Sequence, residues 1–273
     1  MIELNDDYED LEDFFEMYGI STASPGFYDD LNFTRLEQMI PNFLEYYAAF
    51  VLKKSFSPDY LQESEEKIFK ISKILHKELI RDGRQGACID LSLVLSRILD
   101  LENVWNYITK GSVTIEFPPD SNISKKYFWS VYYGQFKAGH VWVVAPPFKI
   151  VDLTIHQQPY KMNEEKYIPD IILQKEASIS DMQLSDIISP EVMQQLNIKA
   201  GRDHLKILNS INPRLIPFYD FFEVDNFISG ETKFKYTPFG ITASDQPLKN
   251  ITSLKLNGIY GLEIYNDLIK GKL

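Results

Sequence analysis

The sequence has a single cysteine, Cys88, and only four histidines. One cysteine excludes an internal disulfide and a zinc site built from several thiolates. No two histidines have the H-x-x-x-H spacing that places two metal ligands on one face of a helix. We therefore expect neither a bound metal nor another cofactor.

Long apolar runs and clustered positive charges are also missing. No stretch approaches the roughly 18 consecutive apolar residues that span a bilayer. The first residues, Met-Ile-Glu-Leu-Asn-Asp-Asp, lack the basic and apolar regions of a signal peptide. We expect a cytoplasmic protein that does not bind a membrane. The chain has no stripe of lysine and arginine suited to a phosphate backbone, which argues against nucleic acid as a partner.

The net charge of −11 is concentrated at one end of the 273-residue chain. Residues 1–30 contain ten acidic side chains and no basic one, whereas the rest of the chain is nearly neutral. We expect residues 1–32 to form an acidic N-terminal arm. This arm is either the solvated face of a helix or a docking segment for a basic protein partner.

Hydrophobic residues recur with helical spacing in some segments and cluster in short β-rich runs in others. Spacings of three and four predict helices at 33–54, where Pro41 could bend the helix, and at 58–81, 88–99 and 178–198. Runs rich in Val, Ile, Tyr, Phe and Trp predict antiparallel strands at 103–117, 127–136, 140–145 and 148–155. Further strands are expected at 233–242 and 252–256, before a short final helix.

Helices and strands are segregated along the chain, which predicts an α+β fold. We expect the helices of residues 33–100 to pack on an antiparallel sheet formed by residues 103–156. Residues 33–160 are then the core of the protein. Residues 161–273 form a mixed α/β C-terminal extension.

Cys88 stands at the expected beginning of a helix. Gly86 permits a sharp turn just before it, and the unpaired amides of a first helical turn favour a negative charge on the sulfur. The alternative is an inert cysteine that packs with Leu91 and Leu95 in the core.

A histidine and an aspartate lie on the two strands that follow. If the hairpin turns about Pro146, His140 faces Asp152 on one side of the sheet. An aspartate within Ile-Val-Asp-Leu is costly to bury without a partner, and His140 is the nearest candidate. Cysteine, histidine and aspartate supply the nucleophile, proton carrier and orienting carboxylate of thiol catalysis. His156 is an alternative base if the second strand continues that far.

Three segments resemble motifs of the transglutaminase-like superfamily: Arg84-x-Gly86-x-Cys88-x-Asp90, Gly139-His140-x-Trp142 and Val151-Asp152-Leu153-Thr154. The resemblance implies a papain-like catalytic core within residues 33–160. It implies that Cys88 is the nucleophile, His140 the general acid and base, and Asp152 the orienting carboxylate. The activity implied is that of a thiol hydrolase or acyltransferase. Such an enzyme hydrolyses a peptide or protein amide, or passes its acyl group to an amine.

The match to this family is incomplete. Leu153 stands where the family usually has proline, and Val144 where it usually has glutamate. An oxyanion site needs a second hydrogen-bond donor beside the Cys88 amide. The candidates in the sequence are Gln85, Tyr46 and Tyr47.

Two alternative functions are compatible with the same residues. The arylamine N-acetyltransferase family has the same triad, but its Gly-Gly-x-Cys-x-Glu and Asp-Val-Gly-Phe-Gly segments match this chain less well. The second alternative is a catalytically silent transglutaminase-like module that binds proteins.

Overall fold

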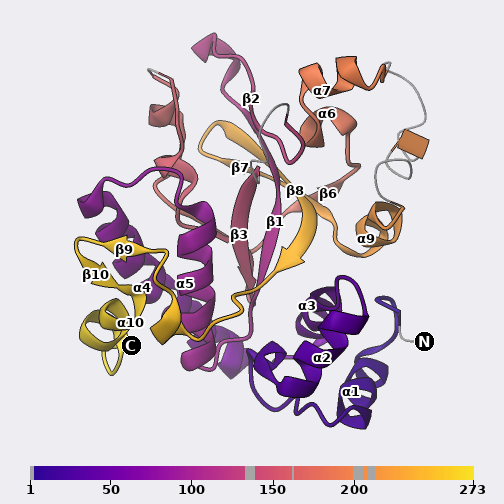
Figure 1. The fold of residues 1–273 in the computed structure, drawn as a ribbon. Helices are drawn as coiled ribbons and strands as arrows, with labels where there is room; N and C mark the ends of the chain where they lie inside the picture. Colours follow the sequence, from indigo (N-terminus) through magenta and orange to yellow (C-terminus); the bar gives the residue numbers. More distant parts are fainter. Residues whose placement is uncertain (1–2, 133–138, 162, 199–205, 208–212) are drawn as a thin grey trace.

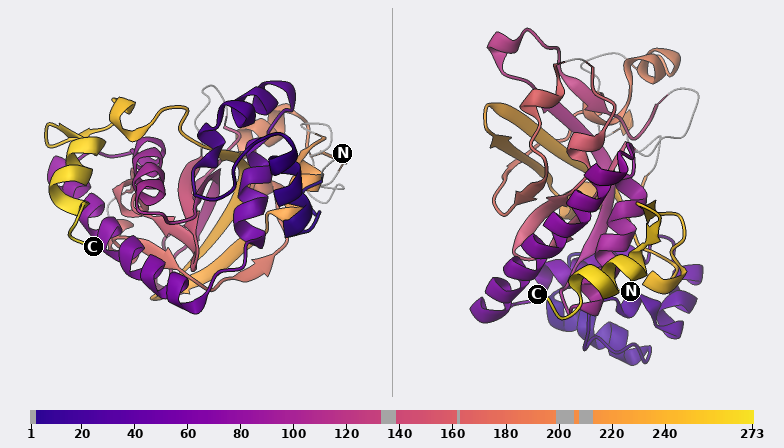
Figure 2. Two further views of the ribbon diagram at one scale, coloured as in Figure 1. Left: turned by 90° about the horizontal axis from the view of Figure 1, so that it is seen from below. Right: turned by 90° about the vertical axis from the view of Figure 1, so that its left-hand side faces the viewer.

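The computed structural model describes residues 3–132, 139–161, 163–198, 206–207 and 213–273. A curled antiparallel sheet occupies the centre of the molecule, and helices cover both of its faces (Figures 1 and 2). The fold class is therefore α+β. Among the described residues, no helix is both long enough and apolar enough to cross a membrane.

The sheet contains eight strands in the described part of the chain, and every pair is antiparallel. Their order is β5-β4-β3-β1-β8-β7-β6, with β2 also paired to β1. The strands are β1 (Tyr107–Glu116), β2 (Lys126–Phe128), β3 (His140–Ala145), β4 (Phe148–Asp152), β5 (Ile172–Gln174), β6 (Ser178–Ser180), β7 (Val224–Ser229) and β8 (Thr232–Thr242).

Strand β8 links the C-terminal part of the chain to the centre of the sheet. It pairs with β1 from Ile108↔Thr242 to Glu116↔Lys233. Residues on both sides of position 160, where we expected the core to end, thus belong to one sheet. This pairing places side chains of β8 next to those of β3 and β4.

The N-terminal part of the chain forms one helical layer. It consists of α1 (Tyr8–Met17), α2 (Leu31–Met39) and α3 (Leu44–Lys53). The single helix expected at 33–54 is wrong, because α2 and α3 are separate. Pro41 lies between them, and Asn42 adopts a left-handed backbone with φ of 59°. Proline has no amide hydrogen and its ring blocks the preceding turn, so the first helix ends instead of bending.

The acidic N-terminal segment packs on this layer. Leu11 and Phe15 of α1 are fully buried, and the ring of Phe15 packs against Phe43 and Phe50 at centroid distances of 6.1 and 5.9 Å. The opposite side of α1 exposes Glu9, Asp10, Asp13 and Glu16. The segment is therefore an amphipathic helix with an acidic outer face.

The second helical layer consists of α4 (Pro58–Asp82) and α5 (Cys88–Leu101). Helix α4 begins where the sequence predicts, because the Ser57 side chain accepts a hydrogen bond from the Tyr60 amide at 3.2 Å. It ends at Gly83, which has a left-handed φ of 75°. The last segments of the chain, β9 (Lys255–Leu256), β10 (Ile259–Tyr260) and α10 (Gly261–Ile264), lie beside these two helices (Figure 1).

The region after β5 differs most from expectation. The helix expected at 178–198 begins as strand β6, because Ser178–Ser180 pairs with β7. Only α6 (Leu184–Ile187) and α7 (Pro190–Gln195) are helical there, and α9 (Leu215–Phe221) follows. The strand expected at 127–136 is the short β2, and residues 133–136 lie outside the described residues.

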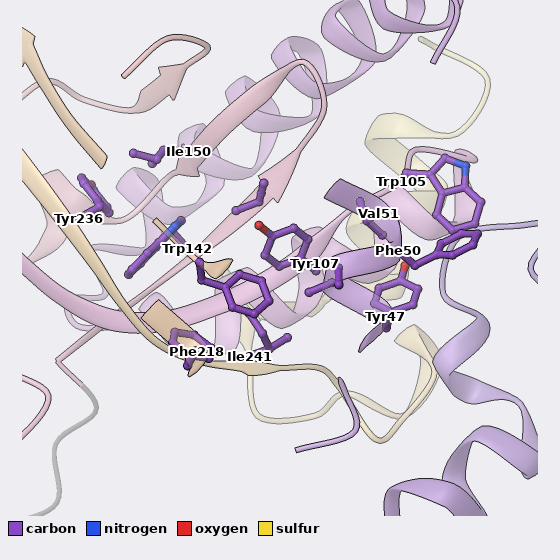
Figure 3. Packing of buried hydrophobic residues seen from close by; sticks show 14 of the residues in the cluster. Tyr47, Phe50, Val51, Trp105, Tyr107, Trp142, Ile150, Phe218, Tyr236 and Ile241 are labelled. Carbon is purple, nitrogen blue, oxygen red and sulfur yellow. The ribbon is translucent and has the colours of Figure 1, made fainter. Parts of the chain in front are cut away.

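Strand β3 separates two apolar clusters and is buried along its whole length. Val141 and Val143 pack in the cluster that contains α4 and α5. Trp142 and Val144 belong to the other cluster, which continues into the N-terminal layer. Figure 3 shows part of this second cluster, in which Trp142 and Tyr236 of β8 lie near each other. The alternation of β3 thus directs Trp142 and Val144 into the cluster that continues into the N-terminal layer, and His140 lies on the same face of the strand.

Candidate active site

His140 and Asp152 form a buried pair at the ends of neighbouring strands. His140 begins β3 and Asp152 ends β4. The ring nitrogen Nε2 lies 2.6 Å from carboxylate oxygen Oδ2, and neither side chain is exposed to solvent. The sequence predicts this contact.

The strand register that we expected for this contact is wrong. A two-residue turn at Pro146-Pro147 places Ala145 opposite Phe148, which is a shift of one residue from the expected register. An irregularity in the pairing between Val143 and Ala145 adds a second residue, so that Val143 is opposite Val151. Asp152 is therefore displaced by two positions from the residue directly facing His140. A shift of two residues preserves the face of each side chain, so the imidazole and the carboxylate still meet diagonally.

Both oxygens of Asp152 are fully engaged. Oδ1 accepts hydrogen bonds from the amide and the hydroxyl of Thr154, at 2.9 and 3.0 Å. Oδ2 accepts one from the Tyr236 hydroxyl at 2.8 Å, in addition to its contact with His140. Burial opposes the charge of Asp152, but His140 and these donors outweigh it and lower the pKa of the carboxyl. The chain thus holds a carboxylate in its interior.

The charge of this carboxylate acts on the imidazole. Burial alone would lower the pKa of His140, but Asp152, and after it Cys88, raise the pKa to about 10. The site therefore favours the charged form of His140. Its second nitrogen, Nδ1, has no hydrogen bond of good geometry within the described part of the chain.

Cys88 is the first residue of α5 and lies close enough to the His140 ring to affect its protonation. Because Nε2 is bound to Asp152, Nδ1 is the ring nitrogen available to the sulfur. Cys88 is 7% exposed and also belongs to the apolar cluster of α4 and α5. The thiol is therefore packed among hydrophobic residues and adjacent to the His140 ring.

The turn before α5 is fixed from two sides. Gly86 has a left-handed φ of 68°, and its amide donates to the carbonyl of Gln157 at 3.0 Å. Nη2 of Arg84 lies 2.9 Å from the Asp90 carboxylate, across the first turn of the helix. No side chain in the described residues caps this helix end. The first-turn amides thus remain available for a negative charge beside the sulfur.

Other candidate residues are less well placed. His156 lies in the 3-10 turn Ile155–Gln157, after β4 has ended, and its Nδ1 contacts Gln157 instead of Asp152. The Tyr47 hydroxyl accepts from the Gly26 amide at 3.0 Å, within the N-terminal layer. Tyr46 lies on the same helix α3, whereas Gln85 is exposed in the turn next to Cys88. Of the oxyanion donors considered, only Gln85 adjoins the site along the chain.

The structure adds residues that sequence reasoning missed. Tyr236 comes from β8, and the Phe128 ring of β2 lies 5.9 Å from the His140 ring. The backbone just before His140 also lies close to β1 and β2, and only a glycine fits there. A Cβ at Gly139 would lie 2.5 Å from the Phe128 carbonyl oxygen and 2.7 Å from that of Gly111. The glycine before His140 was the available signal for a close backbone contact.

Comparisons with known proteins do not assign the site. The chain has no significant match to a protein-family model, a curated protein or a solved structure. Within the described residues, no group of three or more His, Cys, Asp and Glu side chains is arranged to hold a metal ion. A function for the site therefore has to be inferred from the geometry of Cys88, His140 and Asp152.

Proposed function

We propose that this chain is a cysteine-dependent acyl-transfer enzyme with a transglutaminase-like, papain-like core. Cys88 is the nucleophile, His140 the general acid and base, and Asp152 the carboxylate that orients the imidazole. The observation that carries the proposal is the buried His140–Asp152 pair, which leaves Nδ1 for a cysteine at the start of a helix. The expected substrate is a peptide or protein amide.

In the first half of the reaction, Sγ of Cys88 attacks the carbonyl carbon of the amide as a thiolate. The carbonyl π electrons move to oxygen, and the backbone amide of Cys88 at the start of α5 stabilises that oxyanion. His140 gives its Nδ1 proton to the amide nitrogen as the C–N bond breaks. The products are a free amine and a thioester on Cys88.

In the second half, neutral His140 accepts a proton from water or from an acceptor amine. The activated oxygen or nitrogen attacks the thioester carbonyl, and the C–S bond breaks to return the thiolate. Asp152 holds the ring throughout and stabilises its charged form. Acid–base transfer of this kind contributes about 10²- to 10⁴-fold to the rate.

Alkylation of the single cysteine tests the proposal directly. Iodoacetamide near pH 7 is expected to modify Cys88 faster than it modifies the unfolded chain, because the proposed nucleophile lies beside the His140 ring and at the start of α5. Mass spectrometry reports the site without ambiguity, since Cys88 is the only thiol. His140→Gln, which removes the imidazolium, is expected to slow the reaction to the rate of an ordinary thiol.

Activity is measured on a panel of peptide amides, with and without a primary amine as acceptor. Cys88→Ala is expected to abolish amine release. The product formed in the presence of the acceptor amine, a free acid or a new amide, distinguishes hydrolysis from transfer. Amide cleavage that survives Cys88→Ala would show that the proposal is wrong.

The low exposure of Cys88 supports a second candidate, a catalytically silent module that binds proteins. Its contact surface would be the acidic outer face of α1. This candidate predicts an inert thiol, together with binding to a basic protein that is lost when Glu9, Asp10, Asp13 and Glu16 are all replaced by their amides. Those four side chains are exposed, so the replacement preserves the packing of Leu11 and Phe15.

A further inference from the structure

Tyr236 binds the same carboxylate oxygen as the candidate catalytic histidine. Its hydroxyl donates to Oδ2 of Asp152 at 2.8 Å, and His140 Nε2 lies 2.6 Å from that oxygen. The phenol ring is 1% exposed and is held by Trp142, at a centroid distance of 5.0 Å with the planes nearly perpendicular. Figure 3 shows Tyr236 beside Trp142 in this cluster. The hydroxyl therefore has a fixed position.

We propose that Tyr236 is a positioning residue for the Asp152–His140 pair, and that its hydroxyl limits how strongly the carboxylate retains the imidazole proton. A hydrogen bond from a neutral donor withdraws electron density from the oxygen that accepts it. Oδ2 then attracts the proton of His140 less strongly than an oxygen with no second donor. This inference rests on the proposed function, in which His140 must release its proton in every turnover.

The hydroxyl acts as a donor over the whole working range. Burial, and next the negative charge of Asp152, hold the pKa of Tyr236 well above its usual range. Oδ1 of the same carboxylate is occupied by Thr154, so the carboxylate cannot turn to exchange its partners freely. Tyr236 and His140 thus share one oxygen in a single arrangement.

Within the described residues, the other charged or titratable groups next to this pair, or next to the rings packed on it, include Cys88, Tyr160, Lys126 and Glu164. Thr154, which is uncharged, donates to Oδ1 of Asp152. Lys126 lies 5.9 Å from the centre of the Phe128 ring and pairs with Glu164 at 3.3 Å, beyond the aromatic layer. Removal of the Tyr236 hydroxyl therefore takes one hydrogen bond away from Oδ2 and leaves every formal charge in place.

The experiment measures the titration of His140 by NMR in a Cys88→Ala background, which removes coupling to the thiol. The signal is assigned by its loss in His140→Gln. Tyr236→Phe is expected to raise the midpoint, making proton release by the ring about three- to tenfold weaker. Site-specific 3-fluorotyrosine at position 236, a stronger donor of similar size, is expected to lower it. The opposite shifts separate electronic tuning from loss of packing.

Tyr107→Phe is the matched control. Tyr107 lies in the same apolar cluster, but the pKa of its hydroxyl is raised by burial and by Asp225, with no contribution from Asp152. This variant is expected to leave the His140 midpoint unchanged. A midpoint that stays constant or falls in Tyr236→Phe would overturn the inference, because a purely structural tyrosine would only loosen the carboxylate.

The titration is independent of the proposed chemistry. An unreactive Cys88 in the otherwise unchanged protein would contradict the acyl-transfer function, yet Tyr236 could still shift His140. A reactive Cys88 combined with an unshifted His140 in both Tyr236 variants would reject the role of Tyr236 alone.

Discussion

Arg84 and Asp90 form an ion pair across the first turn of α5, with 2.9 Å between Nη2 and Oδ2. Nη1 of Arg84 also donates to the carbonyl of Ser253 at 3.3 Å. The guanidinium therefore connects the turn before Cys88, the first turn of the helix and the C-terminal part of the chain. Cys88 lies between the two partners in sequence, so this ion pair fixes the backbone that presents the sulfur.

Replacing Arg84 by Gln is expected to slow alkylation of Cys88 by about tenfold, because small displacements of a reacting group have large effects on rate. The side chains of Arg84 and Asp90 are 34% and 25% exposed. Loss of a pair this accessible is expected to change the free energy of unfolding by less than about 1 kcal/mol. Iodoacetamide kinetics and urea denaturation measure the two effects.

Arg81→Gln provides the control, because Arg81 forms a similar pair with Glu78 on α4, at 2.8 Å. It is expected to leave the alkylation rate unchanged. Equal rates in the two variants would show that Arg84 does not position Cys88.

The His140–Asp152 pair predicts how stability depends on pH. Folding raises the pKa of His140, so its contribution is complete below about pH 6.5, the unfolded value, and is lost as pH rises through about 10. Folding lowers the pKa of Asp152, so that contribution is complete above about pH 4 and is lost in acid. Between about pH 4 and about pH 6.5 both contributions are complete, so the pair stabilises the folded chain most in this range.

Asp152→Asn removes the charge that sustains this window. The variant is expected to melt at a lower temperature at pH 7, with a much smaller further decrease between pH 7 and pH 10 than in the unchanged protein. Thermal melts across this range provide the measurement, with exposed Asp13→Asn as the control. A steep decrease that persists in Asp152→Asn would mean that other groups cause the pH dependence.

The sequence was sufficient to place the candidate pair but not its surroundings. Alternation along two strands put His140 and Asp152 on one face, and that result survived a register error because the shift was an even number of residues. Gly86 marked the turn before Cys88. Tyr236 follows Asp152 by 84 residues and reaches it only because β8 pairs with β1, which local patterns do not specify.

Similar reasons explain the errors in the fold. Helical spacing continued across Pro41, so the pattern alone did not reveal that two helices pack as separate pieces. Ser178–Ser180 is too short for a clear alternation, and its pairing with β7 determines its conformation. Tertiary contacts thus overrode weak local preferences in both places.

Gly139→Ala is expected to disturb the site through the backbone. The added Cβ would lie 2.5 Å from a carbonyl oxygen of β2, a contact that only backbone movement can relieve. We expect a loss of about 1–3 kcal/mol in stability and slower alkylation of Cys88, since His140 is the next residue. Urea denaturation and iodoacetamide kinetics report both.

Gly240→Ala is the matched control within the same sheet. Its Cβ would meet the Cε atom of Lys110 at 2.8 Å, near the end of a flexible side chain that can move aside. This substitution is expected to be nearly neutral. If the two alanine variants lost stability equally, the close backbone contact at Gly139 would not be the cause.

Arg97 connects three parts of the molecule from a buried position. Its guanidinium forms two contacts with Asp29, at 2.6 and 2.8 Å, and a longer one with Asp100 of α5 at 3.4 Å. It also donates to the carbonyls of Ser244 and Gln246, at 2.6 and 3.0 Å. The N-terminal layer, α5 and the segment after β8 therefore depend on one side chain.

Arg97→Met is expected to cost about 3–5 kcal/mol, because it leaves the carboxylate of Asp100, which is only 11% exposed, without its cation. Burial already raises the pKa of Asp100 to about 6, against the opposing effect of Arg97. Since folding raises this pKa, the penalty increases as pH rises through it, and the variant should recover part of its stability at pH 5 relative to pH 8. Arg97→Lys keeps the charge but not the planar fork, so an intermediate loss is expected. Urea denaturation at both pH values is the measurement, and equal losses at pH 5 and pH 8 would rule out Asp100 as the source of the penalty. Lys125→Met is the control, because the side chains of Lys125 and its partner Glu116 are 51% and 40% exposed.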